Sequence, residues 1–337
     1  MCANAQLACI CTSALIGALR MDESHQELLA QIASSYYEQG MTQNAIATQL
    51  GLSRVKVYRL LKEAKAEQVV QITINWPIER DNQLEAALKS KFALKDALVL
   101  RTSPQDPSPA LQRLGQLGAR YLEQVLRDGT TMAVCLGRST YEVINAVRPG
   151  FQAQVRVAQA IGSMPFAMQE LDSAALARQL AQQLGGDVLY LSSPVMADSP
   201  EAAAVLRSQQ GIERTLTAAR TADVALVGIG NLDPATSGFV RAGFISPQEL
   251  TRLTADGAVG DVAGQIFTLS GELHACEYNH RVIGITFDEL CRIPTTIAVA
   301  MGQEKAKAIL GCLRACIINV LCTDDQVASE VLGLDRG

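Results

Sequence analysis

The side chains best suited to bind nucleic acid are gathered in one short stretch of this 337-residue chain. Five cations, against the single acid Glu63, fall within residues 53–66. Arginine and lysine in the first turns of a helix reach base edges in the major groove, and those further along meet phosphates. The residues expected to contact double-stranded DNA are Thr42, Gln43, Ser53, Arg54, Lys56, Tyr58, Arg59 and Lys62. The plainer alternative is a surface helix with a solvated basic face.

The segments around this stretch have the pattern of a helix-turn-helix. Thr42 can cap a short helix, and Gly51-Leu52-Ser53 makes the turn to a second one, because glycine tolerates positive φ and serine is a good N-cap. A further amphipathic helix over 25–39 completes a three-helix core. The apolar face of the second helix consists of Val57, Leu60, Leu61 and Ala64. Because these features occur together, the sequence favours DNA binding over a solvated basic face.

A second set of residues is suited to hold an anion. Predicted strands over 131–136 and 295–300 each end in a glycine-containing loop before a helix, and such helix N-termini favour anionic ligands. A carboxylate such as Asp261 can also accept hydrogen bonds from the hydroxyl groups of a ligand. The residues expected to bind an effector are Gly137, Ser139, Thr140, Ser163, Asp261, Gly302 and Lys305. Each of these residues also has a simpler structural explanation. The hydroxyl groups of the first loop could cap the helix, Asp261 could form an Asx-turn, and Lys305 could form an ion pair with Glu304.

From residue 95 onward, apolar strands alternate with helices, which indicates a mainly parallel sheet covered on both faces. Strands are predicted over 97–100, 131–136, 155–161, 187–191, 223–229, 295–300 and 317–322. Helices are predicted over 109–126, 140–147, 173–184, 201–208, 247–254, 304–315 and 325–332. The glycine-rich interval 256–290 predicts hairpins or loops over the sheet edge. The predicted fold class is therefore α/β, with a small winged helix-turn-helix headpiece before a doubly wound domain.

The chain divides into four predicted segments. Residues 1–20 are apolar but have no early positive charge, so we expect no secretory signal. We expect instead a disordered or wrongly assigned N-terminal extension before a natural start at Met21. Residues 21–76 form the DNA-binding domain, in which the alternating run 69–75 predicts a short, half-exposed strand. A linker helix follows over 77–94, and residues 95–337 form the doubly wound α/β domain.

The composition limits the classes of function. A net charge of −5 excludes a protein whose whole surface binds nucleic acid, but a local basic surface on an acidic body is compatible with it. The nine cysteines include no CxxC pair, and His25, His274 and His280 do not complete a metal site. We therefore expect buried free thiols in the cytoplasm, with no metal, no cofactor and no membrane span.

Several motifs along the chain resemble the SorC-type sugar-binding transcriptional regulators of bacteria. The headpiece motif runs from Tyr36-Tyr37 through Thr42-Gln43 and Leu50-Gly51-Leu52-Ser53 to Tyr58-Arg59-Leu60-Leu61. The body resembles the family in five segments, over residues 222–230, 258–264, 281–285, 297–309 and 318–324. The resemblance extends over nearly all of residues 25–334.

This resemblance implies that residues 95–337 form a sugar-phosphate effector-binding and oligomerisation domain, of the kind shared with sugar-phosphate isomerases and deaminases. It implies a phosphorylated sugar as effector, a homodimer or homotetramer, and a DNA affinity that the effector alters. It also implies that Gly137 to Thr140 bind phosphate, and it favours the ligand role for Asp261 and Lys305. The second hypothesis is an isomerase or deaminase with an accessory helix-turn-helix, for which Asp233, Asp256 and Asp261 are the available acids.

Overall fold

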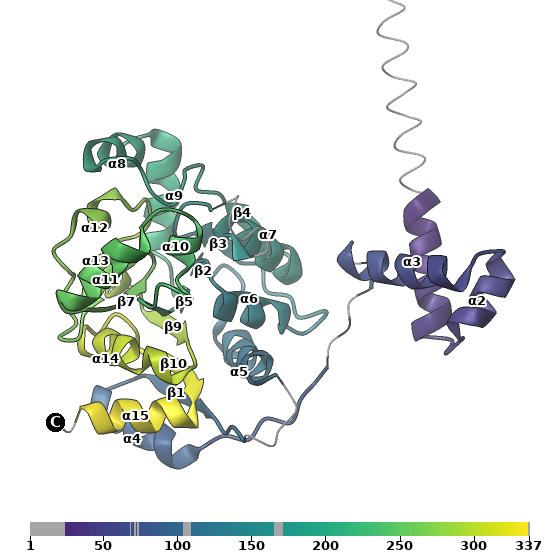
Figure 1. Ribbon diagram of the computed structural model, residues 1–337, viewed down its shortest axis with the longest axis horizontal. Helices are drawn as coiled ribbons and strands as arrows, with labels where there is room; N and C mark the ends of the chain where they lie inside the picture. The colour runs from purple at the N-terminus through teal and green to yellow at the C-terminus, as the bar shows by residue number, and fades with distance from the viewer. Residues whose placement is uncertain are drawn as a thin grey trace, which may run out of the picture. The chain divides into compact units, whose positions relative to one another are not determined.

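The computed structural model describes residues 24–67, 69–70, 72, 74–103, 109–164 and 171–335. The chain forms two compact units, Met1–Ile74 and Asn75–Gly337. Figure 1 shows the smaller unit as a group of helices and the larger one as a sheet enclosed by helices. The extension predicted over residues 1–20 lies outside the described residues.

The smaller unit is a three-helix headpiece. Its first helix is described over residues 24–37, and α2 (Gln43–Leu50) and α3 (Arg54–Ala66) follow. Between α2 and α3, Gly51 takes φ 65°, the left-handed conformation that the predicted turn requires. The buried core of this unit consists of Leu29, Ile32, Ala33, Ile46, Ala47, Val57, Leu60, Leu61 and Ala64. The helix-turn-helix prediction is confirmed, including the apolar face of α3.

The strand predicted over 69–75 is wrong for the residues that the structure describes there. Val69 and Val70 pack against the headpiece core, while Ile72 and Ile74 are 51% and 55% exposed, and none of the four lies in a strand. Alternating hydrophobicity defines two faces, but a strand also needs a neighbour for its N–H and C=O groups. No strand of the described part of the headpiece supplies that neighbour.

The larger unit is built on a seven-stranded parallel sheet with the order β1-β10-β9-β5-β2-β3-β4. Each of the seven predicted strands is present, with slightly different ends. They are β1 (Asp96–Leu100), β2 (Thr131–Val134), β3 (Arg156–Gln159), β4 (Asp187–Leu189), β5 (Val224–Gly228), β9 (Thr295–Val299) and β10 (Val320–Asp324).

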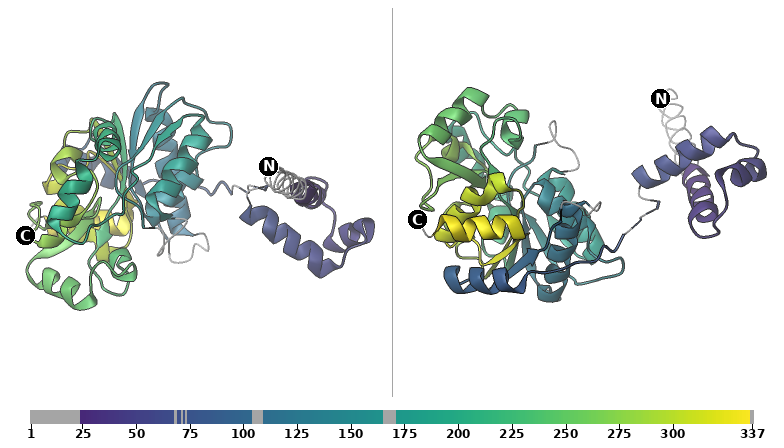
Figure 2. Two further views of the ribbon diagram at one scale, coloured as in Figure 1. Left: turned by 90° about the horizontal axis from the view of Figure 1, so that it is seen from above. Right: turned by 60° about the horizontal axis from the view of Figure 1, so that its bottom comes forward.

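Helices cover both faces of this sheet, as the uninterrupted apolar strands predict (Figure 2). One face packs against α5 (Ala110–Val125), α6 (Arg138–Asn145) and α7 (Ser173–Leu184). The other packs against α4 (Asn82–Phe92), α9 (Gln210–Arg220), α14 (Ala306–Arg314) and α15 (Asp325–Leu334). Neighbouring strand residues alternate between the two cores: Ala133 belongs to one, and Met132 and Val134 belong to the other.

A second, antiparallel sheet has the order β6-β7-β8 and lies beside α14. Its strands are β6 (Gly230–Asn231), β7 (Ala258–Val262) and β8 (Gln265–Thr268), so a hairpin is present in the interval 256–290. The remaining helices are α8 (Pro200–Arg207), α10 (Gly238–Arg241), α11 (Pro247–Ala255), α12 (Glu277–Arg281) and α13 (Phe287–Leu290). Of these, α8 and α11 match predicted helices.

Two boundary predictions need correction. The larger unit begins at Asn75, and the Trp76 amide donates to Gln116 Oε1 of α5 at 3.1 Å, so Trp76 belongs to this unit and not to the headpiece. The helix assigned to a linker over 77–94 is α4, which lies against β1 and α15 with Leu88 fully buried. It is therefore part of the larger unit.

No helix in the described ranges is both long enough and apolar enough to cross a bilayer. The six cysteines of the described part of the chain are all free thiols. Cys135, Cys312 and Cys322 are buried, but Cys291 and Cys316 are exposed, which corrects the expectation of buried thiols throughout.

Candidate functional site

The predicted DNA-binding residues surround the start of α3. Ser53 Oγ accepts the amide of Lys56 at 3.2 Å, and Thr42 Oγ1 accepts the amide of Ala45 at the same distance, so both hydroxyls are N-caps. Gln43 is half-buried. The side chains of Thr42, Ser53, Arg54, Lys56, Tyr58, Arg59 and Lys62 are exposed. The helix therefore presents its cations to solvent while the opposite face fills the core.

A surface hollow of about 670 Å³ lies at the N-terminus of α2. Its lining joins α2 to the first helix and to α3, and it contains Tyr36, Tyr37, Gly40, Met41, Thr42, Gln43, Asn44 and Arg54. The N-terminus of α2 offers unpaired amides, and Arg54 adds a positive charge. Such a hollow is suited to a phosphate of a nucleic-acid backbone. Tyr36 and Tyr37 are not among the residues that the sequence predicts to contact DNA.

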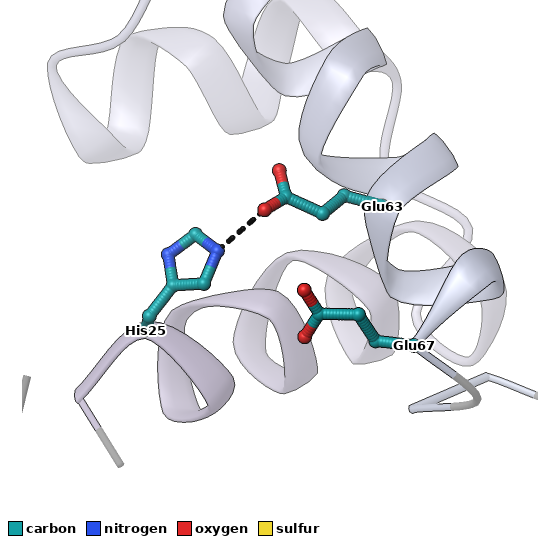
Figure 3. A group of neighbouring side chains, drawn as sticks. All are labelled: His25, Glu63 and Glu67. Carbon is teal, nitrogen blue, oxygen red and sulfur yellow. Dashed lines mark hydrogen bonds and ion pairs between the residues drawn. The ribbon is translucent and has the colours of Figure 1, made fainter. Parts of the chain in front are cut away.

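The single acid of the basic stretch is tied to the first helix. Figure 3 shows His25 pointing toward Glu63 of α3, and its Nε2 lies 2.7 Å from Glu63 Oε1. Glu67 completes a group of three whose ligand atoms all lie within 4.8 Å of one another. The sequence analysis did not bring His25 together with these carboxylates. The hydrogen bond joins two of the three helices that form the headpiece core.

The larger unit contains a cavity of about 290 Å³ beyond the carboxyl ends of β2, β5 and β9. This is the position at which open parallel sheets bind ligands. Four of the predicted effector residues line it: Gly137, Ser139, Asp261 and Lys305. Other polar groups of the lining are Arg138, Asn231, Thr236, Ser237, Arg241 and Glu304.

The first loop of the cavity leads directly into α6. Gly137 takes φ 135° at the N-cap position and provides no side-chain cap, and Arg138 is the first helical residue. Ser139 and Thr140 therefore lie inside the first turn, which excludes the N-cap alternative for both. Thr140 is fully buried, and its Oγ1 has no hydrogen-bond partner among the described residues. This end of α6 can offer backbone amides and hydroxyls to an anion.

Asp261 and Lys305 bring opposite charges to the same cavity. Burial raises the pKa of Asp261 from 3.8 to about 6, and the positive charge of Lys305 opposes that shift. Burial lowers the pKa of Lys305, against the charges of Glu304 and Asp261. Gly230 pairs with Asp261 across β6 and β7, and a Cβ there would overlap the Asp261 carboxylate. The glycine thus leaves room for the carboxylate beside the neighbouring strand.

The remaining three predicted effector residues do not line the cavity. Thr140 lies behind its wall, 3.8 Å from the position that a Cβ on Gly228 would take. Ser163 Oγ accepts Gln159 Nε2 at 3.1 Å, and the Gly302 amide donates to Asp324 Oδ2 at 3.2 Å. Ser163 and Gly302 therefore hold neighbouring segments together in this structure.

Four of the six polar cavity residues that the sequence does not predict lie in the segment 231–241, which runs from the end of β6 to the end of α10. Asn231 and Arg241 lie in no motif with a chemical signature, whereas Arg138 stands inside the predicted phosphate loop and could have been included. The acids proposed for an enzyme are dispersed. Asp233 accepts the amide of Ala235 in a turn, and Asp256 is the C-cap of α11, so neither joins Asp261 in the cavity.

Comparison with known proteins identifies the family. Residues 76–333 match the family model described as "Putative sugar-binding domain". The transcriptional regulator LsrR of Enterobacter sp. (strain 638) is 33% identical over 317 residues, which are 92% of this chain and 94% of that protein. The chain belongs to the SorC-type family of transcriptional regulators. This is the resemblance that the sequence motifs carry.

Two further regulators are similar to this chain. The deoxyribonucleoside regulator of Bacillus subtilis is 29% identical, with 93% of this chain and 99% of that protein covered. The full-length sorbitol operon regulator SorC of Klebsiella pneumoniae has a similar crystal structure, with a TM-score of 0.68 at 29% identity and coverage of 91% and 99%. These relatives are regulators and not enzymes, so the isomerase or deaminase hypothesis is not retained.

Proposed function

We propose that this chain is a DNA-binding regulator of a sugar-utilisation operon, and that a phosphorylated sugar controls its affinity for operator DNA. The observation that carries the proposal is the cavity beyond the parallel sheet, where the N-terminus of α6 and the ammonium group of Lys305 face one space with Asp261. A cavity of about 290 Å³ is at the small end of ligand sites, which suits a monosaccharide phosphate.

Each part of the ligand has a partner in this proposal. The phosphate lies at the loop from Gly137 to Thr140, where backbone amides at the start of α6 and the charge of Lys305 stabilise it. Asp261 accepts hydrogen bonds from sugar hydroxyls. Ser163 and Gly302 act from behind this shell, since the Ser163 hydroxyl accepts from Gln159 and the Gly302 amide donates to Asp324.

The headpiece supplies the second site. The start of α3 enters the major groove, with Arg54, Lys56 and Arg59 directed at base edges or phosphates. A homodimer or homotetramer would present two such helices to a two-fold operator. The effector changes DNA affinity only if it binds two states of the assembly unequally. Because operator DNA is the target, we place the protein in the cytoplasm.

The test of DNA binding uses a duplex selected by the chain from a random library. Arg59→Ala removes one exposed cation and should weaken binding at least several-fold, because a base or phosphate contact is lost. Arg252→Ala, which removes an exposed arginine of α11 in the other unit, is the control and should bind normally. Equal affinity of the two variants in a gel-shift titration would contradict the role of α3.

The test of effector binding uses thermal-shift screening against pentose and hexose phosphates, because a ligand of the native state raises its melting temperature. Lys305→Ala should remove both the shift and the change in DNA affinity while leaving basal DNA binding intact. Lys307→Ala, an exposed neighbour on α14 outside the cavity lining, should keep the response. A full response in the Lys305 variant would show that the phosphate lies elsewhere.

A further inference from the structure

The most exposed large apolar side chain in the described part of the chain is Val55, at 67%. It lies in the first turn of α3, between the exposed cations Arg54 and Lys56. Val57, two residues later, is fully buried and belongs to the headpiece core. Val55 therefore points away from that core, on the side of the helix that carries the charges.

Neither helix formation nor packing explains a valine at this position. A β-branched residue loses side-chain freedom in a helix, so an exposed helical position favours alanine or a long polar residue. The isopropyl group is also left in water, where it gains no burial within the headpiece. The alternative is that the isopropyl group is buried in a complex, when another molecule covers this face of α3.

We propose that Val55 packs against the C5-methyl group of a thymine in the operator and so helps to select its sequence. This inference rests on the proposed DNA-binding function of α3. Thymine presents the one apolar group of the four bases in the major groove, and small aliphatic side chains recognise it by contact. The flanking charges of Arg54 and Lys56 bring a polyanion to this turn.

Tyr58 is the other exposed apolar group on α3, at 47%, but its surroundings differ. The Lys62 ammonium lies 5.3 Å from the centre of its ring, which gives the ring a cationic partner within the helix. Tyr58 also stands one turn further from the N-terminal end, where helices of this class contact bases. Val55 is therefore the apolar side chain of the first turn that can contact a base.

The experiment removes the same methyl group from the DNA. A duplex selected by the wild-type chain from a random library is synthesised with single thymine-to-deoxyuridine replacements, which delete the methyl and keep every hydrogen-bonding group. At one thymine, wild-type affinity should fall about fourfold, the equivalent of one buried methyl group. Val55→Ala should bind the thymine duplex more weakly and should lose its sensitivity to that replacement.

The controls separate this contact from a general loss of binding. Val205→Ala shortens a valine that is 61% exposed on α8 of the larger unit, and it should remain sensitive to the missing methyl. Val55→Ala should melt at the wild-type temperature or above, because alanine is the better helix former.

Three results would overturn the inference while leaving DNA binding intact. They are a selected site without an invariant thymine, wild-type affinity that ignores deoxyuridine at every position, and equal sensitivity in the wild type and Val55→Ala. Failure to select any duplex would overturn the proposed function, and this inference with it.

Discussion

The carboxyl group of Asp261 lies in a position that disfavours its own charge. Burial keeps water from this carboxyl group, and the charge of Lys305 offsets the loss of water only in part. A hydrogen-bond acceptor held in this way is suited to sugar hydroxyls, which donate to it when a ligand binds. The same arrangement lowers the stability of the ligand-free protein.

Asp261→Asn should stabilise the ligand-free protein, and the gain should grow with pH. The native pKa of about 6 lies above the ordinary value of 3.8, so between these pH values the native state binds more protons than the unfolded state. Stability therefore falls as pH rises through this window, and the whole cost is present above pH 7. This pKa shift corresponds to a loss of about 1–3 kcal/mol in the free energy of unfolding, once the partial exposure of Asp261 is allowed for.

Thermal unfolding at pH 4.5 and pH 7.5 measures this effect. Asp256→Asn, which replaces an exposed carboxyl group outside the cavity lining, is the control for the chemical change itself. A gain in the Asp261 variant that is equal at the two pH values would show that the buried charge does not destabilise the native state.

Individual cavity residues could be predicted only where a motif pointed to them. Gly137 and Lys305 stand at strand-to-helix junctions, which local sequence identifies, and both line the cavity. Asn231 and Arg241 reach it because β6 and α10 fold back over the sheet, and no local pattern encodes that return. Ser163 is a suitable residue type and follows a strand, but its hydroxyl oxygen accepts a hydrogen bond from the Gln159 side chain.

At the scale of elements, the position of Asp261 depends on how closely β7 packs on α14. Gly260 precedes it, and a Cβ at Gly260 would overlap the Ala308 side chain and lie 2.7 Å from the Gly230 carbonyl oxygen. The strand can approach the helix only because this residue has no side chain. The packing of these two elements therefore sets the distance between the small sheet and the cavity wall.

Gly260→Ala should destabilise the protein by about 1–3 kcal/mol, because the strand or the helix must move to admit the methyl group. It should also weaken binding of a sugar phosphate, since Asp261 moves with the strand. Gly211→Ala in α9 is the matched control: its Cβ meets nothing within 4 Å, and it should stabilise by about 0.5–1 kcal/mol. Denaturant unfolding compares the two variants, and equal stabilities would contradict this account of the packing.

The larger sheet was predictable because each of its strands is a short apolar run between helices, and burial on both faces requires that pattern. The elements that were missed or wrong lack such a local signal. The helix α9 begins after Gln209 without a side-chain cap and has a glycine in its first turn, so the sequence does not show where it starts. The run 69–75 alternates like a strand, but its described residues have no partner strand.

At the scale of the whole molecule, the charge is distributed unevenly. The chain carries −5 overall, yet residues 53–66 contain five cations and one acid, and that acid is hydrogen-bonded to His25. Counterions screen charges beyond about 10 Å at 0.1 M salt, so DNA bound at α3 responds mainly to the charges next to it, which include these five cations. An acidic body also discourages indiscriminate binding to DNA.

The uneven charge should make DNA binding depend strongly on salt concentration. The logarithm of the DNA association constant should fall linearly with the logarithm of salt concentration, because each neutralised phosphate releases counterions. Lys62→Ala should make that slope shallower by about one and weaken binding to all sequences alike, since a contact with phosphate carries no sequence information. Lys307→Ala, in the other unit, removes the same charge and should leave the slope unchanged. Fluorescence anisotropy over a series of salt concentrations measures both, and matching shifts in the two variants would mean that net charge, and not the basic face of α3, governs the approach to DNA.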